Sequence, residues 1–206
     1  MVVYLMTLDL DISKNGLHFD LLSDRYQGRS HSVLLNPYED PNLMSFLIRG
    51  REAYFSARDS GDQRLPTAII SEYVYRNIKA SGQKSEQTHH KHFLNGKTPN
   101  LSEFVDGAAC REKNLFAHLL LAQLGYPSEF RIGYIDDGKV MDTHAWNYVP
   151  ITDEVVDAIM GKAIKSSSYY KIVTGEFRSP QILALPHHEI WGWSPFGRNF
   201  EFRRNN

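Results

Sequence analysis

The sequence contains one cysteine, and its surroundings favour a reactive thiol. Cys110 follows the small residues Gly107, Ala108 and Ala109 and stands at the start of an apolar helical pattern. A thiol in the first turn of a helix faces the positive end of the helix dipole and backbone N–H groups without intrahelical acceptors, and both favour the thiolate. Because there is a single cysteine, an internal disulfide and a zinc site built on several thiolates are excluded.

A base and an acid for this thiol are predicted further along the chain. His144 begins the run His-Ala-Trp-Asn-Tyr-Val, which is expected to form a strand. Asp157 interrupts a short apolar strand pattern, where a carboxylate is out of place unless it has a partner. If residues 144–149 and 155–159 pair as an antiparallel hairpin, Asp157 lies beside His144 and can orient its imidazole. The predicted catalytic triad of a thiol enzyme is therefore Cys110, His144 and Asp157.

Residues 107–158 resemble the transglutaminase-like superfamily, whose fold is related to that of papain. The motifs are Gly-Ala-Ala-Cys at a helix start, Leu-Gly-Tyr-Pro at the helix end, His-Ala-Trp-Asn and Val-Val-Asp-Ala, in the family order. The resemblance implies that a helix bearing the nucleophile packs on an antiparallel sheet. It implies Cys110 as nucleophile, His144 as base and Asp157 as the orienting acid, with Trp146 as a structural aromatic residue near the site.

The third position of the triad has alternatives. The interval from His144 to Asp157 is 13 residues, about two shorter than in the family pattern, and removing two residues from a hairpin keeps a side chain on its face. One rival arrangement uses Asp153. Another treats residues 152–165 as an inserted helix and places Glu176 opposite His144.

The chemistry implied by this triad is acyl transfer through a thioester. Cys110 would attack a carboxamide or peptide carbonyl and expel an amine through His144. Water then gives hydrolysis or deamidation and an amine gives cross-linking; deamidation or transglutamination of protein glutamine is the expected reaction. The Cys110 N–H and one further donor would hold the oxyanion. Candidate side-chain amides for that second donor are Gln83, Gln87, Asn95 and Asn100.

Other functions fit the same residues. The fold also permits a cysteine protease. The run Cys-Arg-Glu-Lys-Asn from Cys110 to Asn114 resembles the Cys-x-Glu-x-Asn of arylamine N-acetyltransferases, although Gly-Ala-Ala stands where that family has Arg-Gly-Gly. A catalytically silent binding module and a zinc site formed by Cys110, His144 and Asp157 are further alternatives.

Before Cys110 the pattern predicts strands and then helices. Strands are expected at 2–11, 17–22 and 30–36, the first two joined by an Asn-Gly turn, and helices at 42–58 and 67–80. The polar segment 81–100 contains Gly, Ser, Asn and Pro and is predicted to be a loop. Its three histidines, His89, His90 and His92, are expected to be solvated.

After Cys110 the pattern alternates between one helix and several strands. The helix is expected to end at Gly125, with Arg111, Glu112 and Lys113 on the exposed face of its first turn. The sequence predicts strands at 130–135, 141–149, 155–159 and 169–177, a tight turn at 136–139, and an aromatic tail from residue 181.

Length and composition indicate one ordinary soluble domain of the α+β class. The chain has 206 residues, 42% of them apolar and 23% charged, with a net charge of −1. It divides into a β and helical part (1–100), a catalytic core (101–180) and the tail (181–206). The near-neutral charge gives no reason to expect a nucleic-acid partner, and no membrane span or targeting segment is visible. We expect a protein or peptide substrate, no cofactor, and a cytoplasmic location unless export uses no cleaved signal peptide.

Overall fold

The first described elements of the chain are two strands near its N-terminus. The computed structural model describes residues 18–22, 30–35, 37, 39–136 and 141–169. Strands β1 (His18–Leu22) and β2 (Ser30–Leu34) pair antiparallel, which confirms two of the predicted strands. The predicted strand 2–11 and its Asn-Gly turn, residues 137–139 of the tight turn, the predicted strand beyond Tyr169, and the tail lie outside the described residues.

Helices α1 (Pro41–Asp59) and α2 (Pro66–Asn77) confirm the two predicted helices. Both begin with proline, whose fixed φ suits the first helical position and whose missing N–H costs nothing there. Asp40 caps α1, because its Oδ1 accepts hydrogen bonds from Asn42 N at 3.1 Å and Leu43 N at 3.0 Å. The α2 helix ends earlier than the sequence pattern, since Ile78 is already extended.

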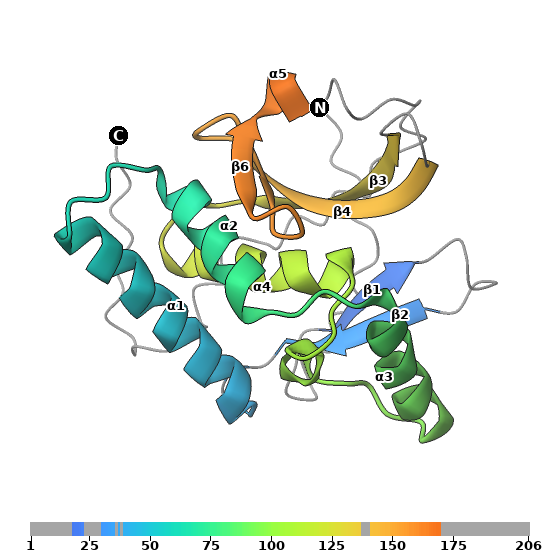
Figure 1. Ribbon diagram of the computed structural model, residues 1–206. Helices are drawn as coiled ribbons and strands as arrows, with labels where there is room; N and C mark the ends of the chain where they lie inside the picture. Colours follow the sequence, from blue (N-terminus) through green and yellow to red (C-terminus); the bar gives the residue numbers. More distant parts are fainter. Residues whose placement is uncertain (1–17, 23–29, 36, 38, 137–140, 170–206) are drawn as a thin grey trace.

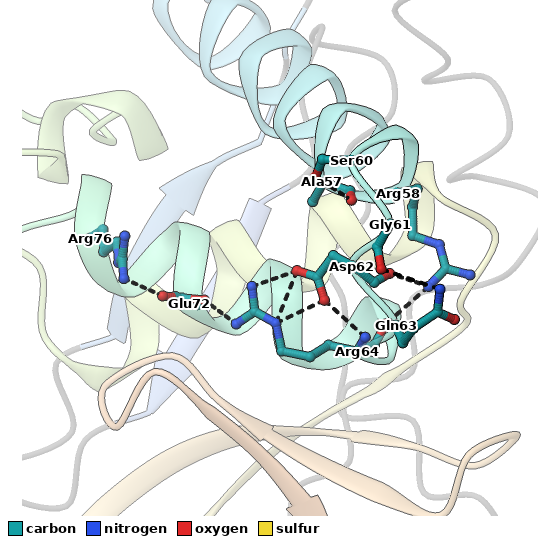
Figure 2. A network of polar contacts seen from close by, with 9 residues as sticks. All are labelled: Ala57, Arg58, Ser60, Gly61, Asp62, Gln63, Arg64, Glu72 and Arg76. Atoms are coloured by element: carbon teal, nitrogen blue, oxygen red, sulfur yellow. Dashed lines mark hydrogen bonds and ion pairs between the residues drawn. The ribbon is translucent and has the colours of Figure 1, made fainter.

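A surface network of charged side chains binds the turn between α1 and α2 (Figure 2). Arg64 pairs with Asp62 at 2.7 Å and also with Glu72, which in turn pairs with Arg76. Arg58 Nη1 donates to the carbonyls of Asp62 at 3.0 Å and Arg64 at 3.2 Å. Because these groups are solvated, each pair contributes little to stability, and we assign the network a local structural role.

The segment predicted to be a loop contains helix α3 (Gly82–Leu94), so that prediction was wrong. Ser81 caps the helix by accepting a hydrogen bond from Lys84 N at 3.3 Å. The segment lacks an apolar stripe, and the contacts that hold it are polar: Ser85 and His89 are buried and both hydrogen-bond to Glu112 of the next long helix. A polar helix held by tertiary contacts gives little signal in a periodicity analysis.

Helix α4 (Cys110–Gln123) lies at the centre of the molecule (Figure 1). It contacts α1, α2, the 3₁₀ helix η3 (Leu101–Phe104) and three strands of the main sheet, and most of its residues are buried. It ends just before Gly125, whose φ of 81° is the left-handed conformation that terminates many helices. Both ends of the predicted helix, with Cys110 at the start and Gly125 at the stop, are therefore confirmed.

The main sheet has four antiparallel strands in the order β3-β4-β5-β6. Strands β3 (Glu129–Asp136), β4 (Met141–Val149) and β5 (Glu154–Asp157) match the predicted ones, whereas β6 (Lys162–Lys165) was not predicted. The inserted helix considered for 152–165 is contradicted, because this stretch contains two strands and a turn at Gly161. A short helix α5 (Ser166–Tyr169) follows. The described chain is thus α+β: α2 and α4 contact the four-stranded sheet, α1 packs on α2 and α4, and α3 lies apart from that sheet (Figure 1).

Candidate active site

Cys110 is the first residue of α4 and is partly exposed. The strand-like segment before it is fixed by backbone hydrogen bonds to residues 79–81: Ser81 N donates to Ala108 O at 2.8 Å, and Ala108 N donates to Lys79 O at 2.9 Å. Since the first N–H groups of a helix have no backbone acceptor within the helix, the thiol stands at the positive end of the dipole. The chain thus holds this sulfur at a rigid helix entrance.

His144 and Asp157 lie side by side on neighbouring strands. The β4–β5 pairing ends at Asn147 and Val156. The side chains of His144 and Asp157 lie just beyond that last pair. His144 Nε2 is 2.7 Å from Asp157 Oδ2, and both side chains are buried. His144 also lies close enough to Cys110 for a negative sulfur to raise the pKa of the imidazole. The fold thus brings the three predicted residues together.

The Asp157 carboxylate is fully engaged in hydrogen bonds. Its Oδ1 accepts from Ile159 N at 3.0 Å and Met160 N at 3.4 Å, and its Oδ2 accepts from the Tyr169 hydroxyl at 3.0 Å. Burial alone would raise the pKa of Asp157, but the hydrogen bond and positive charge of His144, with these other donors, hold it below its usual value. The sequence did not indicate Tyr169 as a partner, because it reads there as the first residue of a strand.

The electrostatics of the site favour a charged imidazole. Burial would lower the pKa of His144, but its hydrogen bond to Asp157, its interaction with Cys110 and the negative charges on both outweigh that cost and raise it to about 10. Burial likewise opposes the charge of Arg111, yet Glu112, Glu86 and Cys110 together raise its pKa. A negative sulfur at this helix entrance therefore has two cationic neighbours.

Trp146 packs behind the imidazole. It is fully buried, and its ring is stacked on that of His144 with centroids 6.3 Å apart and an interplanar angle of 22°. Its ring is also tilted against that of Tyr169, with centroids 5.7 Å apart. These contacts restrict the tilt of the imidazole, which is a structural role.

The first turn of α4 is buried, contrary to the sequence prediction. The Glu112 side chain is 0% exposed and accepts hydrogen bonds from its own turn at Ala109 N (2.8 Å), from Ser85 Oγ (3.0 Å) and from His89 Nε2 (3.0 Å). Burial opposes its charge, but the His89 hydrogen bond and the Arg111 guanidinium lower the pKa of Glu112 to about 2.

The neighbouring residues of that turn are covered as well. Lys113 is 1% exposed, its Nζ donates to Tyr75 O on α2 at 3.3 Å, and the Arg111 side chain is 11% exposed. Helix α3 contacts one side of the turn and α2 the other, and a helical pattern alone cannot reveal such neighbours. Likewise His89 is buried, although its segment was expected to be solvated.

Of the two alternative third residues, the described one, Asp153, has other hydrogen-bond partners than His144. Asp153 is exposed and accepts hydrogen bonds from Tyr148 at 3.2 Å and Ser166 at 2.6 Å. Glu176 lies outside the described residues.

Among the amides considered as oxyanion donors, two occupy helix ends. Asn95 Nδ2 donates to Lys91 O at 2.7 Å at the end of α3, and Asn100 caps η3. Gln83 and Gln87 are exposed on α3. No second oxyanion donor is assigned among them.

The comparisons with known proteins leave the family open. Searches against protein-family models, curated proteins and solved structures found no match. Within the described residues, no group of three or more His, Cys, Asp or Glu side chains is arranged to hold a metal ion. In that same part of the chain, every helix is too short or too polar to cross a bilayer.

Proposed function

We propose that this chain is a thiol enzyme with a transglutaminase-like, papain-related fold, in which Cys110, His144 and Asp157 act on a carboxamide or peptide carbonyl. The observation that supports this most is the buried His144, hydrogen-bonded to Asp157 at 2.7 Å and close enough to Cys110, at a helix N-terminus, for a negative sulfur to raise the pKa of the imidazole. A buried imidazole between a carboxylate and a thiol suits proton transfer to and from a nucleophilic sulfur.

The proposed reaction runs through a thioester. The Cys110 thiolate attacks the carbonyl carbon, forming a C–S bond and an oxyanion that the Cys110 N–H can stabilise. Collapse of this intermediate breaks the C–N bond, and the imidazolium of His144 gives its proton to the departing amine. Neutral His144 then takes a proton from water or an incoming amine, whose attack breaks the C–S bond and restores the thiolate.

Protein glutamine is the proposed substrate, through deamidation or transglutamination. This choice rests on the resemblance of residues 107–158 to the transglutaminase-like superfamily, in which a primary carboxamide is attacked. The buried pair of His144 and Asp157 supports the catalytic step and is neutral as to the acyl donor.

Intact-mass analysis tests the proposal. The protein is incubated with an unfolded, glutamine-rich protein, with and without a biotinylated primary amine, and Cys110→Ala serves as the control. We expect a gain of about 1 Da per modified glutamine without amine, and an amine adduct with loss of ammonia when it is present. Peptide fragments would instead indicate a protease, and acetyl transfer from acetyl-coenzyme A to an arylamine would indicate the acetyltransferase alternative. Equal results for wild type and Cys110→Ala would contradict the thiol mechanism.

A further inference from the structure

Asn114 makes hydrogen bonds to the backbone at all three parts of the candidate triad. Its Nδ2 donates to Cys110 O at 3.0 Å and to Ala145 O at 2.7 Å. Its Oδ1 accepts from Ala158 N at 3.0 Å. Ala145 directly follows His144 and Ala158 directly follows Asp157. One side-chain amide therefore joins the residues or their immediate neighbours on α4, β4 and just after β5.

The bonds to Ala145 and Ala158 lie beyond the part of β4 and β5 that is paired. The β4–β5 ladder stops at Asn147 and Val156, so Ala145 and Ala158 lie beyond its last pair. Asn114 is fully buried, and its amide provides one planar group with two donors and an acceptor. In a buried site these hydrogen bonds fix the distance from α4 to the ends of β4 and β5 more tightly than apolar packing does.

We propose that Asn114 is the positioning residue of the candidate active site, setting the sulfur of Cys110 against the imidazole of His144 and the carboxylate of Asp157 through their backbones. This inference rests on the proposed function. Asn114 touches no substrate in this scheme; it acts through the placement of the other three residues. Displacement of a reacting group by about 1 Å can cost on the order of a hundredfold in rate.

A second buried asparagine provides a matched control. Asn147 is also fully buried and also joins β4 to α4, because its Nδ2 donates to Asn114 O at 2.8 Å. Its Nδ2 also lies 3.5 Å from Asn114 Oδ1, a long contact, and among the described residues its side chain does not hydrogen-bond to Cys110, Ala145 or Ala158. Replacing it with alanine removes a buried amide of the same size from the same interface and that one long contact, and keeps the partners of the three shorter bonds of the Asn114 side chain.

The test measures alkylation of Cys110 by iodoacetamide as a function of pH in the wild type, Asn114→Ala, Asn114→Ser and Asn147→Ala. Wild type should react rapidly at about pH 6, where an isolated thiol is protonated. We expect Asn114→Ala to lose roughly tenfold or more of this rate at about pH 6 and to stay within about threefold at pH 9, as for a thiol released from its imidazole. Asn147→Ala should keep the wild-type profile.

Asn114→Ser keeps the test decisive if the alanine variant does not fold. A helical serine can still bond to Cys110 O one turn back, but its short side chain cannot reach Ala145 O or Ala158 N. Its profile should resemble that of Asn114→Ala. A wild-type profile in either folded Asn114 variant, or an equal loss in Asn147→Ala, overturns the positioning role. Slow alkylation at pH 6 in the wild type itself would instead overturn the proposed function.

Discussion

The imidazole of His144 has two acidic neighbours, Asp157 and Cys110. Nε2 lies 2.7 Å from Asp157 Oδ2, and a negative Cys110 sulfur also favours the charged ring. When the ring is charged, Nε2 donates to the carboxylate, so a charge-assisted hydrogen bond stabilises the cation. The Asp157 carboxylate therefore fixes both the orientation of the His144 imidazole and the positive charge near the Cys110 sulfur.

Removing the charge of Asp157 should weaken this arrangement. In Asp157→Asn the amide oxygen still accepts a hydrogen bond, but the negative charge beside His144 is lost, so the pKa of His144 should fall well below about 10. Nuclear magnetic resonance titration of the imidazole measures this shift, and alkylation of Cys110 at about pH 6 should slow by about tenfold. Asp153→Asn replaces an exposed carboxylate four residues away and should change neither result. An unshifted His144 titration in Asp157→Asn would contradict the assignment of Asp157.

At the scale of the elements, the sequence predicted those whose side chains follow a local apolar pattern. Helices at 42–58, 67–80 and from Cys110 to Gly125, and the strands that became β1 to β5, all have such patterns. Helix α3 was missed because Ser85 and His89 face a buried carboxylate rather than an apolar core. The same reason applies to Glu112, whose burial depends on a neighbour that the sequence pattern did not reveal.

The candidate site was predictable to a similar degree. Cys110, His144 and Asp157 have recognisable local settings, and a hairpin brings the last two together. Asn114 could have been noticed as a polar residue in an apolar helix, one turn after Cys110. Its bonds to Ala145 and Ala158 depend on the packing of three elements, which no local pattern encodes.

Close packing of α1 on α4 predicts an unusual effect of a glycine substitution. An alanine in a helix interior is ordinarily favoured over glycine by about 1 kcal/mol. At Gly50, however, a Cβ would lie 2.6 Å from Cδ2 of Leu120, a fully buried side chain. We expect Gly50→Ala to lower the free energy of unfolding by about 1–3 kcal/mol, since overpacking outweighs propensity. Urea unfolding measures it. Gly82→Ala on α3, where a Cβ meets nothing within 4 Å, is the control and should not destabilise.

We expect the carboxylate of Glu112 to anchor α3 to α4. In Glu112→Gln the side chain keeps its size but loses the charge that the His89 and Arg111 side chains face, so α3 should detach more readily from α4. Hydrogen exchange should show α3 amides exchanging about tenfold or more faster, with α2 amides nearly unchanged. Glu103→Gln is the control: its bond to His92 also reaches α3, but at an exposed site that contributes little. Equal acceleration in both variants would contradict this anchoring role.

At the scale of the whole molecule, several of the buried titratable groups lie on or beside α4. Glu112 and His118 are on the helix, and His144 and Asp157 are on strands that reach its N-terminal end. The protein has almost no net charge, so its pH response depends on these groups more than on overall repulsion. The shifted pKa values of these groups set the pH ranges over which the free energy of unfolding should change.

The acidic and alkaline sides of the stability profile should respond to different histidines. Burial lowers the pKa of His118 to about 4, so between pH 6.5 and 4 the unfolded chain binds a proton that the native state refuses, and stability falls as the pH is lowered. Below 4.5 the depressed pKa of Glu112, about 2, extends this loss. The pKa of His144 is instead raised to about 10, so its stabilising contribution is complete below 6.5 and is lost as the pH rises towards 10. Stability should therefore be greatest near pH 6.5.

Two histidine variants measured by urea unfolding from pH 4 to 10 separate these contributions, and each is the control for the other. His118→Asn can still bond to the Ser128 hydroxyl, which lies 2.7 Å from Nδ1 of His118, and should flatten the slope between pH 6.5 and 4.5 by up to about 1.4 kcal/mol per pH unit. It should leave the alkaline slope unchanged. His144→Asn should do the reverse, because the group that loses its proton above pH 6.5 is gone. If His144→Asn keeps the alkaline slope of the wild type, the imidazole is not held as a cation between Asp157 and Cys110, and the ion pair on which the proposed chemistry depends does not form.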